Sequence, residues 1–188
     1  MKRREAIKSV ALLMGGALSL STLAVFQSGC NPSEEKQSGV FTLDQKNLFD
    51  DIADIIIPET TSPGAREAQV GIVIAAILED CYKPEDQNLV IKSLEEIDKR
   101  SSELFKAAFV KVSLTDKTKL IEELDKEAYT LDEKERKDIH NGYKIIKELT
   151  LLGYFTSEAG ATQALNYNMV PGRFDGCVDL KPGQKAWA

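Results

Sequence analysis

The sequence predicts an all-α protein, a single helical bundle of about five main helices followed by an irregular C-terminal segment. Three observations predict this class. Apolar residues recur at helical spacing through residues 42–152. No segment alternates polar and apolar residues for long, as a half-buried strand would. A length of 188 residues with a hydrophobic fraction of 43% suits one domain with a single core.

The first two helices are expected between residues 42 and 82. Thr42 and Gln45 form a capping-box pattern, an apolar stripe follows, and Pro58 ends the helix. A loop, "PETTSPGA", precedes the second helix, residues 66–82, whose middle is apolar on every side. We therefore expect the second helix to be the central and most buried one.

Three more helices follow. One starts near Pro84 and reaches about residue 106, one is capped near Ser113, and one covers residues 131–152 with Gly153 just after its end. The inward-facing residues expected on them are Val90, Leu94, Ile97 and Leu104, then Leu120, Ile121, Leu124 and Ala128, and then Ile139, Tyr143, Ile146 and either Leu149 or Leu152.

Residues 1–30 are set apart because they follow the plan of an export signal. A short basic head precedes an uncharged apolar stretch, residues 10–26, and small residues follow. Arg3 and Arg4 begin "RREAIK", which resembles a twin-arginine export motif except at Ala6; an ordinary positively charged signal is the alternative. The apolar stretch is short for a membrane span, which needs about 20 residues, although an uncleaved anchor stays open.

The end of this signal resembles a lipobox. Cys30 follows two small residues, although Gln27 stands where leucine is usual. We therefore expect residues 1–30 to be an export signal with a lipobox, residues 31–41 a polar tether and residues 42–188 the helical domain. The protein would then be a lipoprotein anchored in the membrane on the periplasmic side. Its net charge of −6 argues against a nucleic-acid partner.

Cys81 and Cys177 are the cysteines outside the signal. An exported protein meets an oxidising compartment, so these residues are predicted to form a disulfide, with two unpaired thiols as the alternative.

The residues give little support for catalysis. His140 is the only histidine, and no serine or cysteine stands in a nucleophile motif. Asp50, Asp51 and Asp54 form a cluster that solvation on the polar side of a helix explains. We expect no catalytic residue, no metal and no cofactor bound by this chain.

The segment "GYFTSEAGATQALNYNMVPGRFDGC", residues 153–177, differs from the charge-rich helices before it. Thr156 or Ser157 can cap a short helix within it. We interpret the segment as a protein-binding surface, since aromatic residues, methionine and arginine are enriched at interfaces; the alternative is that it covers the open end of the bundle. The predicted partner-binding residues are Tyr154, Phe155, Thr156, Ser157, Glu158, Tyr167, Met169, Pro171, Arg173 and Phe174.

Two blocks, "DDIADIIIPETTSPGAREAQV" and "LTLLGYFTSEAGATQALNYNMVPGRFDGC", together with Arg3 and Arg4, resemble the gluconate 2-dehydrogenase subunit 3 family over about residues 42–178. The resemblance implies the small subunit of a membrane-associated, FAD-dependent sugar or polyol dehydrogenase. The large subunit, a glucose-methanol-choline-type (GMC-type) flavoprotein, would carry FAD and catalysis, and the small subunit would dock to it and lead it through the twin-arginine route. A cytochrome c subunit stays open as a further partner. The alternative functions are a free-standing anchored lipoprotein that binds a small ligand between its helices and, more weakly favoured, an enzyme.

Overall fold

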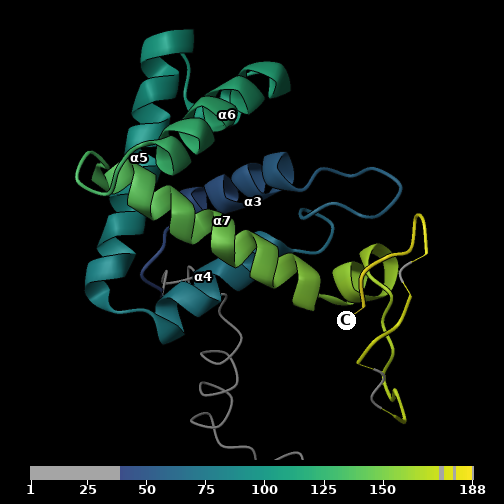
Figure 1. The fold of residues 1–188 in the computed structure, drawn as a ribbon. Coiled ribbons are helices and arrows are strands. Elements are labelled where there is room, and N and C mark those ends of the chain that lie inside the picture. Colours follow the sequence, from purple (N-terminus) through teal and green to yellow (C-terminus); the bar gives the residue numbers. More distant parts are fainter. Residues whose placement is uncertain (1–38, 174–175, 180, 188) are drawn as a thin grey trace, which may run out of the picture. The chain divides into compact units, whose positions relative to one another are not determined.

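The computed structural model describes residues 39–173, 176–179 and 181–187. Arg3, Arg4, Cys30 and Phe174 therefore lie outside the described residues. Five long helices, α3 to α7, and two short ones, η1 and η2, make up the regular structure, with no strand element in the described part of the chain (Figure 1). The predicted all-α class is confirmed. The bounds are α3 Leu43–Ile56, α4 Val70–Cys81, α5 Pro84–Phe105, η1 Phe109–Lys111, α6 Leu114–Thr130, α7 Asp138–Thr156 and η2 Gly160–Ala164.

Local capping signals set the helix starts as predicted. The Thr42 hydroxyl accepts a hydrogen bond from the Gln45 amide at 3.2 Å, and the Gln45 side chain accepts one from the Thr42 amide at 2.9 Å. Pro84 is the first residue of α5, and the Ser113 hydroxyl caps α6 through the Asp116 amide. The structure confirms these predicted helix starts. They could be predicted from the sequence because each depends on contacts between near neighbours in the chain.

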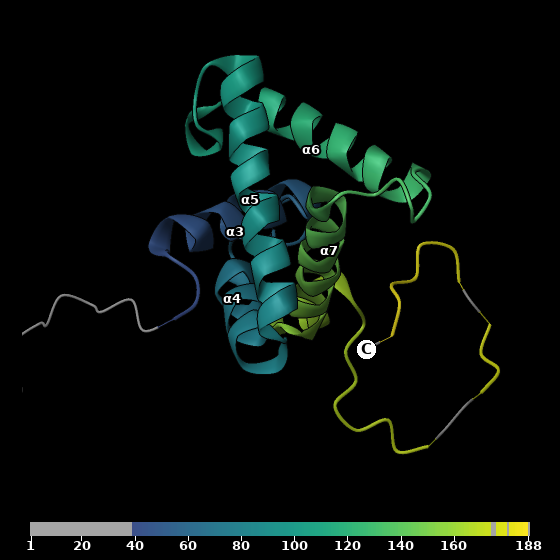
Figure 2. The same cartoon turned by 90° about the vertical axis from the view of Figure 1, so that its left-hand side faces the viewer.

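The second helix is shorter than predicted and is not the central one. It begins at Val70, because residues 66–69 form turns and Gln69 takes a left-handed conformation with φ 54°. Although the helix is apolar around its whole circumference, one of its sides faces solvent, since Ile72 is 59% exposed. The central helix is α7, which contacts α3, α4, α5 and α6 (Figure 1; Figure 2).

Helix α7 begins and ends later than predicted. Residues 133–135 form a turn after α6, and α7 starts only at Asp138. It then continues through Gly153, which is buried where α4 crosses: a Cβ atom at Gly153 would lie 3.2 Å from Val70 Cγ1. Of the two leucines left open for its inner side, Leu149 is buried and Leu152 is 50% exposed. Leu104, predicted to face inward on α5, is 61% exposed.

Helices α5 and α7 approach each other closely at Gly142. A Cβ atom there would lie 2.5 Å from Ser93 Cβ and 2.8 Å from the Leu89 carbonyl oxygen. The buried Ser93 hydroxyl donates to the Ile139 carbonyl at 2.9 Å, so this crossing has little room to move apart.

We therefore predict that Gly142→Ala lowers the free energy of unfolding by about 1 kcal/mol or more, because overpacking a tight contact outweighs the better helix propensity of alanine. Urea denaturation measures the change. Asn141→Ala, on the less buried side of the same helix, is the control and is expected to stay within about 0.5 kcal/mol of the wild type. A stabilised Gly142→Ala variant would show that the crossing is loose.

Candidate functional site

The loop at residues 57–69 and the C-terminal end of α7 meet in the structure, although they are far apart in the sequence. The Tyr154 hydroxyl donates a hydrogen bond to the Pro63 carbonyl at 2.6 Å. Its side chain is only 2% exposed. These two regions belong to the two sequence blocks singled out above, so the structure brings both blocks to one end of the bundle. Tyr154, predicted to bind a partner, is instead a core residue that joins the loop to α7.

Ion pairs hold the loop against α3. Arg66 contacts Asp51 at 2.6 Å and Asp54 at 3.1 Å, and Lys117 of α6 contacts the other oxygen of Asp51 at 2.6 Å. Asp50 accepts a hydrogen bond from the Gly71 amide. Burial raises the pKa of Asp50, and that hydrogen bond offsets only part of the increase. Solvation alone is thus the wrong explanation for this acidic cluster, which ties the loop, α4 and α6 to α3.

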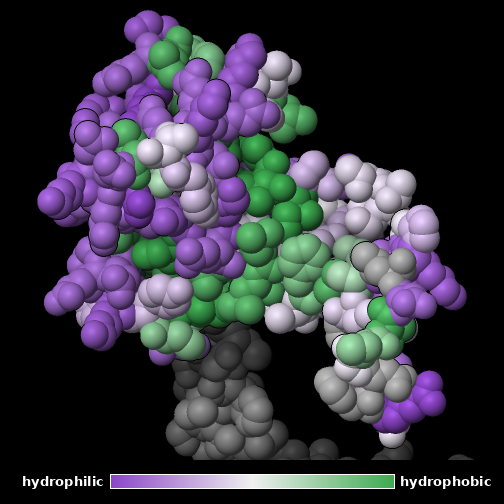
Figure 3. All heavy atoms as spheres, in the orientation of Figure 1, coloured by the Kyte–Doolittle hydropathy of each residue, from purple (hydrophilic) through white to green (hydrophobic). Residues whose placement is uncertain are grey.

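Three large apolar side chains lie exposed on the C-terminal half of α7. Leu151, Leu152 and Phe155 are 39%, 50% and 40% exposed, and we call them the α7 strip. The part of α7 that precedes this strip is polar toward solvent, with Lys144 and Glu148. Hydrophobic side chains gather on this face of the molecule (Figure 3). A contiguous exposed apolar area on a charge-rich domain is typical of a binding surface. The predicted partner-binding residues include Phe155 but neither leucine.

The connection after α7 is a capped π-helical turn. The Ser157 hydroxyl accepts a hydrogen bond from the Gly160 amide at 3.0 Å, as the predicted short helix requires, and donates one to the Tyr154 carbonyl. Thr156 is the last residue of α7, and its hydroxyl bonds to the Leu152 carbonyl at 2.7 Å. The hydroxyl groups of Thr156 and Ser157 therefore serve the fold, whereas Glu158 is exposed.

The chain continues as what we call the C-terminal arm, described at residues 166–173, 176–179 and 181–187 (Figure 2). Tyr167, Met169 and Val170 are 47%, 78% and 76% exposed, and Pro171 and Arg173 are exposed as well. The predicted partner-binding residues of the arm that the structure describes thus lie on the surface, close in sequence to the α7 strip.

The predicted disulfide is not present in the structure. Cys81, at the end of α4, and Cys177, in the arm, are both exposed free thiols. A hydrogen bond from the Lys185 ammonium to the Gln163 carbonyl holds the arm at η2, and this contact does not bring Cys177 to α4.

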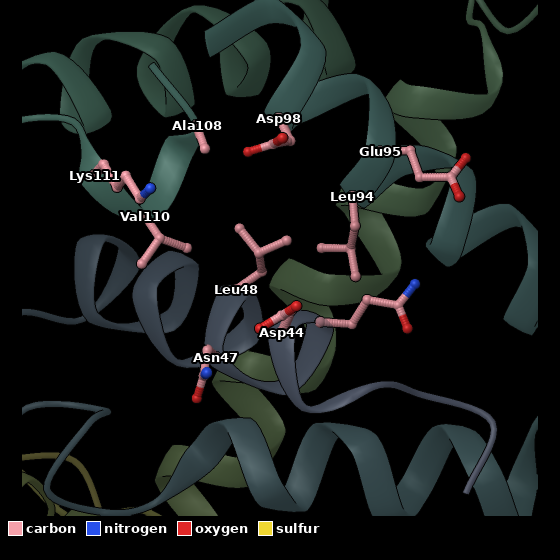
Figure 4. Close-up of a pocket in the computed structure, with 10 residues that line it drawn as sticks. Asp44, Asn47, Leu48, Leu94, Glu95, Asp98, Ala108, Val110 and Lys111 are labelled. Atoms are coloured by element: carbon pink, nitrogen blue, oxygen red, sulfur yellow. The ribbon is translucent and has the colours of Figure 1, made fainter. Parts of the chain in front are cut away.

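An open cleft of 540 Å³ lies between α3, α5 and η1 (Figure 4). Leu48, Leu94 and Val110 form its apolar part. Three of its six polar lining residues are acidic, and one of these, Asp98, already accepts the Phe109 amide at 2.8 Å, which fixes η1 on α5. The cleft has the size and mixed lining of a small-ligand site.

His140 has a structural role. It is 3% exposed, its Nδ1 accepts the Lys137 amide at 3.0 Å, and Nε2 therefore carries the hydrogen that faces Glu127 at 3.0 Å. Burial alone would raise the pKa of Glu127, but hydrogen bonds from Arg100 and His140 outweigh it and lower the pKa. Arg100, Glu127 and His140 together fasten the start of α7 to α5 and α6.

The described residues contain no group of three or more histidine, cysteine, aspartate or glutamate side chains that could hold a metal ion. Within the same part of the chain, none of the helices combines the length and the apolar character that crossing a bilayer requires.

A protein-family model described as gluconate 2-dehydrogenase subunit 3 matches residues 43–172. No curated protein and no solved structure matches the chain. The matched range runs from the first residue of α3 to Gly172, so it contains the α7 strip, η2 and the first part of the arm.

Proposed function

The chain belongs to the gluconate 2-dehydrogenase subunit 3 family, and from this premise we propose that it is the non-catalytic small subunit of an FAD-dependent sugar or polyol dehydrogenase. It would dock to a GMC-type flavoprotein large subunit, lead it out of the cytoplasm and anchor it on the periplasmic side of the membrane. The exposed apolar surface formed by the α7 strip and the arm is the observation that carries this proposal.

The composition of that surface supports docking to a protein. Its members are leucine, phenylalanine, tyrosine, methionine and valine, with exposures between 39% and 78%. Aromatic residues and methionine are enriched where partners bury surface. The helices beneath are fixed by the Tyr154 hydrogen bond and by the ion pairs of Arg66, so the α7 strip is presented on a rigid element, which lowers the ordering entropy lost on binding.

In this proposal the cofactor stays in the partner. The large subunit would hold FAD and carry out the oxidation, and a cytochrome c subunit is a further candidate component that would accept electrons. A flavoprotein folds around FAD before export, and a twin-arginine signal serves folded cargo. The signal at Arg3 and Arg4 would therefore serve both chains once they are docked, and a lipid on Cys30 would retain both.

Co-expression with a flavoprotein large subunit that lacks a signal of its own tests this proposal. We expect both chains to co-purify from the membrane fraction with FAD absorbance. Replacing Arg3 and Arg4 by lysine is expected to keep both in the cytoplasm, whereas the control Lys8→Arg leaves export unchanged. Export of the flavoprotein without this chain would contradict the proposal.

The anchor is tested separately by Cys30→Ser. We expect this variant to release the assembled pair from the membrane fraction into the soluble periplasm, because the acyl chains would be missing. Mass spectrometry of the N-terminal peptide of the wild type should show the added lipid. Membrane retention of the Cys30→Ser variant would favour an uncleaved anchor.

The cleft between α3 and α5 favours a second candidate function, a free-standing lipoprotein that binds a small ligand. The two candidates differ in what stabilises the isolated chain. A rise in melting temperature with millimolar sugars would favour ligand binding, whereas stabilisation by the flavoprotein alone would favour the subunit. Turnover of a sugar by the isolated chain, which we do not expect, would make it an enzyme.

A further inference from the structure

We infer that the C-terminal arm is a closed loop whose second limb, described at residues 176–179 and 181–187, holds the first limb, residues 166–173, in the shape that binds the large subunit. The inference rests on the proposed function and deepens it, because it adds residues beyond the family match to the docking surface. Those residues, Arg173, 176–179 and 181–187, lie after the matched range, which ends at Gly172.

The base of the loop is fastened by backbone contacts. The Asn166 amide donates to the Ala186 carbonyl at 2.7 Å, and Asn166 pairs with Trp187 in an isolated parallel bridge. The Lys185 ammonium donates to the Gln163 carbonyl in η2. The beginning of the first limb and the end of the second limb therefore lie beside each other and beside η2 (Figure 2).

Two Pro-Gly pairs turn the chain within the arm. Gly172 follows Pro171 with φ +70°, and Gly183 follows Pro182 with φ +74°, a conformation that glycine adopts without strain. At the second pair, the Gln184 amide donates to the Lys181 carbonyl at 3.0 Å, and the Gln184 side chain accepts the Lys181 amide at 3.2 Å. Proline followed by glycine is the composition that such turns prefer, so the sequence itself encodes the reversal.

Both limbs carry apolar side chains that the chain's own core does not cover. Val178 and Trp187 on the second limb are 62% and 60% exposed, comparable with Tyr167 on the first limb at 47%. None of the described arm residues is buried. A closed loop with exposed apolar residues on both limbs is suited to a partner, because closure removes part of the ordering entropy before binding.

The occupant that fits these observations is the flavoprotein large subunit. The arm begins directly after η2, which packs on the end of α7, so the arm and the α7 strip are joined by one short element. The chain also belongs to a family of subunits, which implies another chain that covers such surface.

Asn166→Pro tests the inference, because proline lacks the amide hydrogen that closes the loop. Leu165 is extended, with φ −102° and ψ 177°, which is the conformation that a residue before proline favours. Asn166→Ala keeps the amide and is the matched control. Trp187 is the only tryptophan of the chain, so its fluorescence anisotropy decay reports on the base of the loop in the full-length chain in detergent.

In the wild type and Asn166→Ala, we expect Trp187 to rotate mainly with the whole domain, and in Asn166→Pro to gain a dominant fast component. The affinity of Asn166→Pro for the purified large subunit, measured by biolayer interferometry, is expected to fall about tenfold. Fast rotation of Trp187 in the wild type would overturn the inference. Equal affinity of Asn166→Pro and Asn166→Ala for the large subunit would overturn it as well. If the wild type fails to bind the large subunit at all, the proposed function fails and this inference with it. Concentration-dependent self-association through the arm also overturns it.

Discussion

Replacing Leu151 and Phe155 together by glutamate is expected to abolish docking of the large subunit while the chain stays folded. Both side chains belong to the α7 strip and are 39% and 40% exposed, so the change places two carboxylates on a surface already in contact with water. In the complex, the same carboxylates would be buried against apolar groups without a partner, which is strongly unfavourable. We expect the affinity to fall about a hundredfold or more, as for residues at the centre of an interface.

The measurement is co-purification of the flavoprotein together with biolayer interferometry, and circular dichroism checks that the helices remain. Leu104→Glu is the matched control. Leu104 is also a large apolar residue on a helix surface and is 61% exposed, but it lies on α5, outside the α7 strip. We expect the control to bind as the wild type does. An equal loss of binding in both variants would show that added negative charge, and not the α7 strip, is responsible.

The sequence predicted helix starts well because their signals are local. Thr42, Pro84 and Ser113 each act on residues within one turn of the helix, and the structure places all three as expected. The errors occur where distant residues decide the outcome. Residues 66–69 have a helical pattern, but Arg66 is held by Asp51 and Asp54 of α3, and the helix begins only at Val70.

Gly153 shows the same competition at the other end of a helix. A glycine after an apolar stripe is typical of a helix end. Here it provides space for α4, whose Val70 would lie 3.2 Å from a Cβ atom at that position, and α7 continues to Thr156. No single sequence can distinguish a glycine that ends a helix from one that makes room for a neighbouring helix, because both leave the same pattern.

The later end of α7 explains why Tyr154, predicted to lie on the partner-binding segment, is buried in the core. If the helix ended at Gly153, Tyr154 and Phe155 would both be loop residues, and both were predicted to bind a partner. With the helix continued, Tyr154 falls four residues after the buried Thr150 and eight after the buried Ile146, so it extends the inner stripe. Phe155, one residue later, is turned about 100° away, toward solvent.

Tyr154→Ala and Phe155→Ala are therefore expected to have opposite effects, although the residues are adjacent. Tyr154→Ala removes a buried aromatic ring and the donor to the Pro63 carbonyl, and should lower the free energy of unfolding by about 3–5 kcal/mol. Phe155→Ala should lower it by only about 1 kcal/mol, because the ring is 40% exposed, yet should weaken binding of the large subunit about tenfold. Urea denaturation and biolayer interferometry measure the two quantities.

Tyr154→Phe separates the ring from its hydroxyl group. It keeps the buried ring and removes the hydroxyl's hydrogen bonds to the Pro63 carbonyl at 2.6 Å and to the Ser62 hydroxyl at 3.5 Å, so we expect a loss of about 1–3 kcal/mol and unchanged binding. If Tyr154→Phe weakened binding while the free energy of unfolding stayed at the wild-type value, the hydroxyl group would be a contact to the partner and the loop would not depend on it. A stability loss without a binding loss would instead show that the loop at residues 57–69 and α7 form one rigid support, and that the surface on which the partner docks begins at Phe155.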